Sequence, residues 1–285
     1  MTNIDPIERH LFLEGIALKY GYDFREYAEA SLNRRMGNLM SRYQTENLLD
    51  ILKMALRSPE SFQQVLPSLT ITTTEFFRDP LFFKALRNDV FPILKTYSKI
   101  SIWIAGCSTG EEVLSLSIAL KEEKLLHRTT IHATDINAAA IKTAKEGIYP
   151  ASSIQLFNRN YTLAGGNQSP SDYYATEYGL VRFHRDLLDN VVFSEHNLAT
   201  DAVFTEAHLI LCRNVLIYFT RNLQNRALDL FAHSLVFKGF LAIGTKESVR
   251  FSSVAPYFLP IGADNKIYAL KAHAVDFKPL VSGVL

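Results

Sequence analysis

Several features are scarce in this chain of 285 residues, and each scarcity excludes some classes of protein. Cysteine occurs only as Cys107 and Cys212, too few for a disulfide framework and typical of a reducing compartment. No apolar run approaches the ~18 residues that a membrane-spanning helix needs. Residues 1–10 lack the basic start and apolar stretch of a secretory signal. We therefore expect a cytoplasmic protein without direct membrane insertion.

Net charge is also nearly absent, because 30 basic residues face 29 acidic ones. Nothing in this balance draws the chain toward nucleic acid, and we predict no nucleic-acid partner. The eight histidines show no H-x-x-x-H spacing, so we also predict no metal site. What the sequence does have is 48% hydrophobic residues, enough to bury the core of one large domain or two modest ones.

Two patterns divide the chain. Apolar residues recur at mostly helical spacing over residues 6–66, which predicts a small all-helical N-terminal domain at 1–85. From residue 99, strands alternate with helices, which predicts a Rossmann-like, doubly wound α/β domain at 86–285. Expected strands cover 100–105, 129–134, 180–184, 191–196, 207–212, 240–244 and 266–270, and expected helices cover 111–124, 138–146 and 223–237. Residues about 150–190 predict an inserted β-subdomain, since a plain loop of about 40 residues is unusual.

The strongest local signal is the turn between the first expected strand and helix, Ala105-Gly106-Cys107-Ser108-Thr109-Gly110-Glu111-Glu112. A glycine turn after a buried strand indicates a ligand at the carboxyl ends of the strands. The spacing is not that of a dinucleotide loop, and two glutamates would repel a pyrophosphate. A cofactor with a cationic end, such as S-adenosylmethionine, is favoured instead. Ser108 or Thr109 is expected to cap the helix, with Glu111 or Glu112 completing a capping box. Alternatively, the glutamates only complement the helix dipole.

Asp135 is the second local signal, because it ends the next expected strand about 25 residues after the glycine loop. An acid at this place can accept hydrogen bonds from both hydroxyls of a ribose. The alternative is an N-cap of the following helix, a role that Asn137 can fill equally well.

These residues belong to a longer series of motifs that resembles the chemotaxis receptor glutamate methyltransferases, the CheR type, over nearly the whole chain. Besides the glycine turn, the series comprises Thr72-Thr73-Thr74-Glu75-Phe76-Phe77-Arg78, Ala133-Thr134-Asp135-Ile136, Glu195-His196-Asn197-Leu198 and Cys212-Arg213-Asn214-Val215-Leu216-Ile217-Tyr218-Phe219. Each motif alone is weak, but their order and spacing together are specific. The resemblance implies methyl transfer from S-adenosylmethionine to glutamates of chemoreceptors, leaving S-adenosylhomocysteine.

The resemblance also implies roles for single residues. It assigns cofactor binding to Thr72, Thr74, Arg78, Gly106, Glu112, Asp135, Asn197, Leu198, Cys212, Arg213 and Asn214. Within this set, Glu112 lies near the methionine end, Asp135 binds the ribose, and Asn197 with Leu198 reads the adenine.

Arg78 and Tyr218 are the expected catalytic residues. Arg78 would hold a carboxylate of the substrate or of the cofactor, and Tyr218 would lie close to the methyl group. The alternatives are a surface ion pair of Arg78 with an acid such as Asp79, a core position for Tyr218 and a helix cap for Asn214. No general base is needed, because a glutamate side chain is already ionised at neutral pH. Thr72, Val113 and Leu114 depart from the family pattern of asparagine and Pro-Tyr.

The expected partners are the cytoplasmic helices of chemoreceptors. Arg34, Arg35 and Arg42, with Lys53 beyond them, predict a basic helical face that docks these acidic helices, or else a merely solvated face. Two other functions compete with this one. One is methyl transfer to a small molecule or nucleic acid, and the other is a non-catalytic module that binds S-adenosylmethionine or S-adenosylhomocysteine as a regulator.

Overall fold

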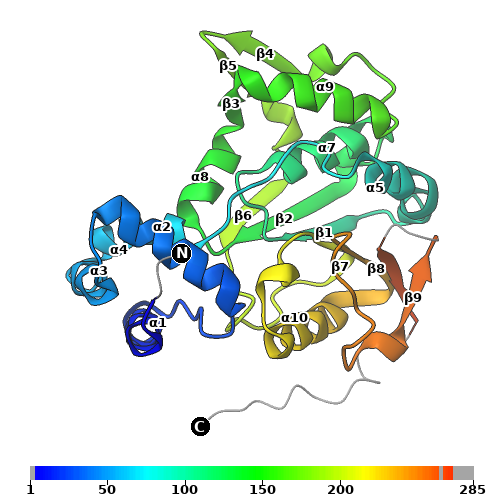
Figure 1. The fold of residues 1–285 in the computed structure, drawn as a ribbon. Coiled ribbons are helices and arrows are strands. Elements are labelled where there is room, and N and C mark those ends of the chain that lie inside the picture. Colours follow the sequence, from blue (N-terminus) through cyan, green and yellow to red (C-terminus); the bar gives the residue numbers. More distant parts are fainter. Residues whose placement is uncertain (1–3, 263–265, 272–285) are drawn as a thin grey trace.

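The chain folds into a group of helices, a central sheet with helices around it and a smaller sheet beyond (Figure 1). This computed structural model describes residues 4–262 and 266–271. The expected domains at 1–85 and 86–285 therefore include short stretches, 1–3, 263–265 and 272–285, that lie outside the described residues. The helical group contains α1 (Pro6–Tyr20), α2 (Glu29–Tyr43), α3 (Leu48–Ala55) and α4 (Pro59–Leu69).

The N-terminal helices have a core of their own. Side-chain caps begin three of them, since Asp5, Asn47 and Ser58 accept hydrogen bonds from backbone N–H groups of α1, α3 and α4. Their apolar faces meet in one cluster that is separate from the clusters on the sheet. The members of this cluster include Phe12, Ile16, Leu32, Met36, Leu48, Val65 and Leu66. This confirms the helical N-terminal domain that the apolar spacing predicted.

The central sheet has seven strands in the order β6-β2-β1-β7-β8-β10-β9. Their bounds are β1 Ile100–Ala105, β2 Thr129–Asp135, β6 Val191–Glu195, β7 Ala207–Cys212, β8 Leu235–Ile243, β9 Phe258–Ile261 and β10 Ile267–Leu270. The first five strands run parallel, and β10 and β9 complete one edge in the antiparallel sense. Because the chain order reverses beside β1, a ligand is expected at the carboxyl ends of β1 and its neighbours.

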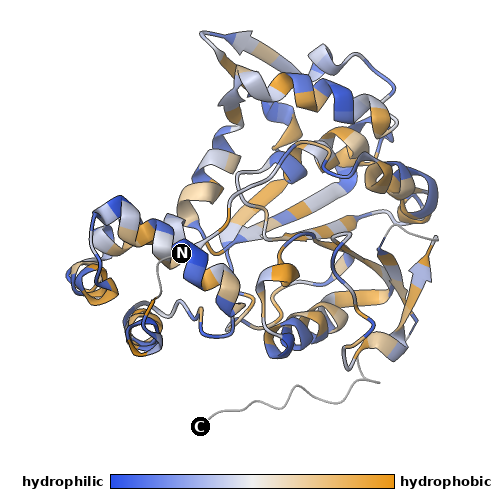
Figure 2. Ribbon diagram, in the orientation of Figure 1, coloured by the Kyte–Doolittle hydropathy of each residue, from blue (hydrophilic) through white to orange (hydrophobic). Residues whose placement is uncertain are grey.

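Helices cover both faces of this sheet. The remaining elements of the domain are α5 (Pro80–Ala85), a π-helical turn (Leu86–Val90), α6 (Phe91–Leu94), α7 (Glu111–Glu122), α8 (Ala138–Glu146) and α10 (Arg221–Ser234). Alternate side chains of β1 enter different clusters. Ile102 packs on the side of α7, and Trp103 meets Phe231 of α10 edge to face, with ring centroids 5.3 Å apart. Figure 2 shows hydrophobic colour running through the central strands, whereas the surrounding helices alternate between hydrophobic and hydrophilic residues. The fold is the expected doubly wound α/β type.

The expected insertion is a three-stranded antiparallel sheet in the order β3-β5-β4. It comprises β3 (Ile148–Pro150), β4 (Tyr174–Glu177) and β5 (Leu180–Phe183), and α9 (Ile154–Leu163) lies beside it in Figure 1. The strand expected from Leu180 is present. The sequence pattern did not predict α9, which occupies part of the segment that lacked a clear rhythm.

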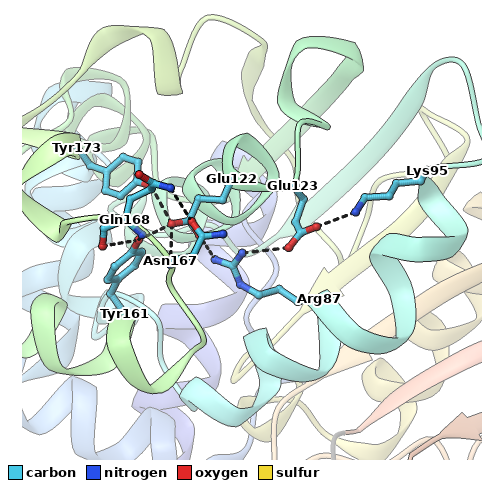
Figure 3. A network of polar contacts seen from close by, with 8 residues as sticks. All are labelled: Arg87, Lys95, Glu122, Glu123, Tyr161, Asn167, Gln168 and Tyr173. Carbon is cyan, nitrogen blue, oxygen red and sulfur yellow. Dashed lines mark hydrogen bonds and ion pairs between the residues drawn. The ribbon is translucent and has the colours of Figure 1, made fainter.

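A buried polar network ties this subdomain to the rest of the chain (Figure 3). Glu122, the last residue of α7, accepts hydrogen bonds from Arg87, from the hydroxyls of Tyr161 and Tyr173, and from the backbone N–H of Asn167. The side chains of Arg87 and Glu122 are 6% and 1% exposed. The helix α7 therefore begins at the glycine turn and ends at the polar network that binds the inserted subdomain.

Most predicted boundaries are within two residues of those observed, but the boundary between α10 and β8 differs by more. The sequence pattern predicted a helix to residue 237 and a strand from 240, but α10 ends at Ser234 and β8 begins at Leu235. The register of β7 against β8 shifts between Ala207 and Leu209, and Lys238 has a positive φ of 62°. This irregularity is a bulge within β8, so the strand begins at Leu235 and continues past Gly239. Hydrophobic spacing alone does not reveal such a bulge.

Candidate active site

A pocket opens at the carboxyl ends of β1, β2 and β7, between the central sheet and the N-terminal helices. All of the predicted site residues line it except Thr72 and Cys212. The predicted residues that do so are Thr74, Arg78, Gly106, Glu112, Asp135, Asn197, Leu198, Arg213, Asn214 and Tyr218. The fold thus brings together motifs that are spread over nearly 150 positions of the sequence.

The two exceptions support the pocket from outside. Thr72 lines an adjoining groove, and its carbonyl accepts a hydrogen bond of 3.2 Å from the Ser108 hydroxyl. Cys212 ends β7 and is completely buried, and burial raises the pKa of its thiol well above the ordinary value. A neutral thiol beneath the sheet edge packs against the core and does not reach the pocket.

Residues 106–108 of the glycine turn line the pocket, and there is no room for a side chain at position 106. Gly106 has a φ of 85°, and a Cβ at this position would lie 2.4 Å from Cγ2 of Val215. Gly110, with a φ of 95°, is the N-cap residue of α7, so the predicted cap by Ser108 or Thr109 is wrong. The hydroxyl of Thr109 instead donates to the Glu111 carboxylate at 2.7 Å.

Asp135 lies at the end of β2 and organises the turn around it. Its Oδ2 accepts from the backbone N–H of Ser108 at 2.8 Å, and its Oδ1 accepts from the backbone N–H of Asn137 at 2.9 Å. The helix α8 is capped by Asn137, whose side chain accepts from Ala139 and Ala140, so Asp135 is not the cap. Each carboxylate oxygen keeps acceptor capacity for a further donor, such as a ribose hydroxyl.

Glu112 forms one side of a buried ion-pair chain. Its Oε1 lies 2.8 Å from Nη1 of Arg213, and Nη2 of Arg213 lies 2.7 Å from Oδ2 of Asp79. The Arg213 guanidinium also lies over the ring of Phe82, 4.0 Å from its centroid. Arg213 is therefore held by two carboxylates and by the ring of Phe82, and it fixes the position of Glu112 in the pocket.

Arg78 has no acidic partner among the residues that the structure describes. Asp79, the neighbour suggested as its surface partner, pairs with Arg213 instead. The guanidinium of Arg78 makes only a 3.5 Å hydrogen bond to the carbonyl of Thr73, and it lines both the pocket and the adjoining groove. Its positive charge is therefore available to a bound anion.

The loop after β7 is held by Glu247. The carboxylate of this buried residue accepts from the backbone N–H groups of Asn214 at 3.1 Å and Ile217 at 3.2 Å, and also from that of Gly244. Burial raises the pKa of Glu247, and the backbone hydrogen bonds oppose that shift. Asn214 has a positive φ of 60°, lines the pocket and leaves its buried Oδ1 without a partner. It is therefore not the helix cap considered as an alternative.

The N-terminal helices complete the pocket, which the sequence alone did not predict. The backbone N–H of Ala28 donates to the carbonyl of Tyr218 at 2.8 Å, and Tyr27 forms an isolated antiparallel bridge with Phe219. Four residues of this part of the chain line the pocket, namely Tyr27, Arg35, Thr70 and Ile71. No periodic pattern indicates contacts between segments that lie about 190 positions apart.

The expected basic face needs one correction. Arg34 and Arg42 are exposed on α2 and line the groove beside the pocket, as that expectation requires. Arg35 is 5% exposed, so it does not belong to a solvated face. The exposed side chain of Lys53 on α3 lines neither the pocket nor the groove.

Comparison with known families assigns this fold and pocket to the binding of S-adenosylmethionine. The SAM-binding domain of CheR methyltransferases matches residues 72–264, and their all-alpha domain matches residues 7–70. The chain belongs to the CheR methyltransferase family.

Named relatives extend the comparison. A protein of Pseudomonas putida named "Putative methyltransferase Cher3" is 48% identical over 262 residues, which cover 92% of this chain and 96% of the relative. A "Chemotaxis protein methyltransferase" of Listeria innocua is 30% identical and is matched over 80% of this chain and 85% of its own length. In an uncharacterized 104.1 kDa protein of Rhodobacter capsulatus, 28% identical, the match spans only 25% of that longer protein.

The described residues lack a membrane-spanning helix and a metal-binding cluster. No helix within 4–262 and 266–271 is long and apolar enough to cross a bilayer. Within the same residues, no group of three or more histidine, cysteine, aspartate or glutamate side chains is placed to hold a metal ion.

Proposed function

We propose that this protein transfers the methyl group of S-adenosylmethionine to glutamate side chains of chemoreceptors, in the cytoplasm, as a protein-glutamate O-methyltransferase. The observation that carries the proposal is the placement of Arg78. Its guanidinium lies where the cofactor pocket meets an open groove, and it has no acidic partner among the described residues. A cation in this position can orient a carboxylate, either that of the substrate or that of the cofactor.

The pocket suits the cofactor along its whole length. Glu112 would face the ammonium group, Asp135 would accept the ribose hydroxyls, and Asn197 with Leu198 would border the adenine. The unpartnered Oδ1 of Asn214 would accept a donor at the amino-acid end. At Gly106 the bare backbone would face the ligand, since a Cβ there would clash with Val215. At Asp135 and Asn214 these assignments use hydrogen-bonding capacity that the protein itself leaves free, and at Glu112 they use the carboxylate oxygen that does not pair with Arg213.

The reaction would depend on alignment. The cofactor supplies an electrophilic methyl group on a sulfonium, and the substrate supplies a carboxylate that is ionised at neutral pH. Tyr218 lines both the pocket and the groove, so its ring would lie beside the path between them. Arg78 and Tyr218 would fix the carboxylate in line with the methyl group, which is where enzymes of this kind gain rate.

The groove would receive the protein substrate. It is lined by Arg34, Asn38 and Arg42 of α2 on one side and by Thr72 and Thr73 on the other. Acidic receptor helices would be attracted to the two exposed arginines, which would raise the rate of encounter more than the final affinity. We therefore propose that the helical domain meets the receptor and that the α/β domain binds the cofactor.

A labelling experiment tests the proposal. The purified protein is incubated with radiolabelled S-adenosylmethionine and membranes that carry chemoreceptors from the same organism. We expect alkali-labile label on the receptor bands, lost in Arg78→Ala and retained in Arg57→Ala, whose exposed side chain lines neither the pocket nor the groove. Cofactor binding without label on any protein would contradict the enzyme and favour a regulatory module.

A further inference from the structure

Residues 26–28, just before α2, pair with residues 218–220 at the end of the loop that follows β7. This antiparallel junction crosses from the helical domain to the α/β domain, around a bridge between Tyr27 and Phe219. Two backbone hydrogen bonds of 2.8 Å hold it, from the N–H of Thr220 to the carbonyl of Glu26 and from the N–H of Ala28 to the carbonyl of Tyr218. The junction therefore fixes the backbone of the loop directly.

Side chains reinforce the junction. The rings of Tyr27 and Phe219 meet edge to face, with centroids 4.9 Å apart. Tyr27 packs against both the hydrophobic cluster of the N-terminal helices and the cluster on the α10 side of the sheet. The hydroxyl of Thr220 donates to the carboxylate of Glu26 at 2.6 Å. Backbone, apolar and polar contacts thus hold the same three pairs of residues together.

Tyr218 lies between this junction and a second anchor. One residue before it, the backbone N–H of Ile217 donates to the carboxylate of the buried Glu247 at 3.2 Å. The carbonyl of Tyr218 itself accepts the bond from Ala28, and its side chain lines both the pocket and the groove. One anchor belongs to the α/β domain and the other to the helical domain, so the place of Tyr218 depends on both domains.

We infer that residues 26–28 are positioning residues for methyl transfer, an inference that rests on the proposed function. Their effect on the reaction passes through Tyr218, whose backbone they hold. The reaction depends on alignment, and a misplacement of about 1 Å can cost about 100-fold in rate. Ala28 is also the N-cap residue of α2, so the start of this helix is bonded directly to the loop. The helical domain would thus contribute to kcat through the junction.

The substitution Ala28→Pro removes one hydrogen bond of the junction and changes little else. Ala28 has a φ of −59°, close to the roughly −65° that proline imposes. Tyr27, the preceding residue, is extended in its bridge, as proline requires of its neighbour. The carbonyl of Ala28 would still accept from the N–H groups of Ser31 and Leu32 in α2. The proline ring puts a methylene group where the N–H now donates, so the carbonyl of Tyr218 must move away.

Steady-state methylation of a soluble cytoplasmic receptor fragment by the full chain measures the effect. In Ala28→Pro we expect kcat to fall by at least about tenfold, with the KM for the fragment changed by less than about threefold. Calorimetry with S-adenosylhomocysteine should give an affinity within about threefold of the wild type, which also shows that the variant is folded. Ala28→Ser, which keeps the N–H, should match the wild type in all three quantities.

Glu26 gives a second test that does not depend on the proline variant. Glu26→Ala removes the acceptor of the Thr220 hydroxyl, whereas Glu26→Gln keeps one. We expect the kcat of Glu26→Ala to fall by about three- to fivefold, because the lost hydrogen bond is exposed and the backbone pairing remains. Glu26→Gln should retain nearly the wild-type kcat.

Four results would overturn the inference. They are an unchanged kcat in folded Ala28→Pro, an equal loss of kcat in Ala28→Ser, a rise in KM with kcat intact, or a loss of affinity for S-adenosylhomocysteine as large as the loss of kcat. The third result would assign the junction to substrate docking, and the fourth would assign it to the cofactor pocket. A wild type that binds S-adenosylhomocysteine but never methylates the fragment would contradict the proposed function, and the inference with it.

Discussion

Glu112 and Arg213, 101 positions apart in the sequence, form an ion pair of 2.8 Å with side chains that are 12% and 2% exposed. The pair joins the first turn of α7 to the loop after β7. Arg213 also holds Asp79 from the segment before the sheet, so three separate motifs meet at one guanidinium. This arrangement fixes the position of Glu112 within the cofactor pocket.

The substitution Arg213→Met should destabilise the fold and weaken the cofactor site together. Removing one partner leaves Glu112 partly buried beside Asp79 without a cation, which costs about 3 kcal/mol for a buried pair. Denaturant unfolding measures this loss, and calorimetry with S-adenosylhomocysteine measures the binding. Arg221→Met, which removes an exposed arginine stacked on Phe251, is the control and should cost much less. Equal stability of the two variants would contradict a structural role for the pair.

The substitution Asp135→Asn should weaken cofactor binding without unfolding the protein. The amide nitrogen of the new side chain would face one of the two backbone N–H groups that now donate hydrogen bonds to the carboxylate. One acceptor for the ribose would also be lost. We expect the affinity for S-adenosylhomocysteine to fall by about 10- to 100-fold. The exposed Asp172→Asn serves as the control. Unchanged affinity in Asp135→Asn would remove Asp135 from the site.

The same residue predicts opposite effects of pH on binding and on stability. Burial raises the pKa of Asp135 above its ordinary 3.8, despite backbone hydrogen bonds that lower it. Ribose hydroxyls favour the ionised form, so affinity should fall as the pH drops through the folded-state pKa. The folded chain also takes up this proton at a higher pH than the unfolded chain, so acidification should raise the stability of the wild type relative to Asp135→Asn.

Two titrations check this prediction. The affinity for S-adenosylhomocysteine and the melting temperature are measured for the wild type and Asp135→Asn between about pH 8 and 4. The differences between the two proteins remove the contributions of other groups. Parallel curves for both quantities would show that Asp135 does not titrate in this range with the predicted sign.

The network in Figure 3 predicts that replacing Glu122 costs more stability than replacing its neighbour Glu123. Glu122→Gln would leave the buried Arg87 without its closest partner and disturb the hydroxyls of Tyr161 and Tyr173, at a cost of roughly 3 kcal/mol. Glu123→Gln should cost well under half of that, because Glu123 is 23% exposed and lies 3.5 Å from Arg87. Urea unfolding of the two variants measures the contrast. A larger loss for Glu123→Gln would show that the network does not anchor the inserted subdomain.

Glu247 should act as a positioning residue for the loop that carries Asn214 and Tyr218. In Glu247→Gln, one of the backbone N–H groups now bound by the carboxylate would face an amide nitrogen, and the loop would shift. Because the reaction depends on alignment, kcat should fall by at least about tenfold while the affinity for S-adenosylhomocysteine changes less. Glu206→Gln, at an exposed position, should match the wild type. A loss confined to stability, with kcat intact, would make Glu247 only a structural residue.

Much of the fold could be predicted from the sequence because local patterns encode it. The nearly continuous apolar run of β1 and the glycine turn after it indicate a buried strand and a ligand site. The order of the motifs placed Asp135, Arg213 and Tyr218 at the same edge of the sheet, where the structure has them.

Other features had no local signal. The placement of Tyr27 against Phe219 depends on packing between distant segments, which periodicity does not encode. Arg35 looked like one more solvated arginine, because an arginine in a run of basic residues has the same spacing whether its helix faces water or a pocket. The assignment of the helix cap to Ser108 or Thr109 failed since Gly110, with its positive φ, lies closer to the helix start.

Mass spectrometry of a receptor fragment incubated with the protein and S-adenosylmethionine tests the central claim most directly. The account predicts peptides that carry one added methyl group on glutamate side chains, removed by mild alkali, absent with Arg78→Ala and present with Arg57→Ala. Peptides without added methyl groups, from a protein that calorimetry shows to bind the cofactor, would contradict it. Methylation of any other residue type would contradict it as well.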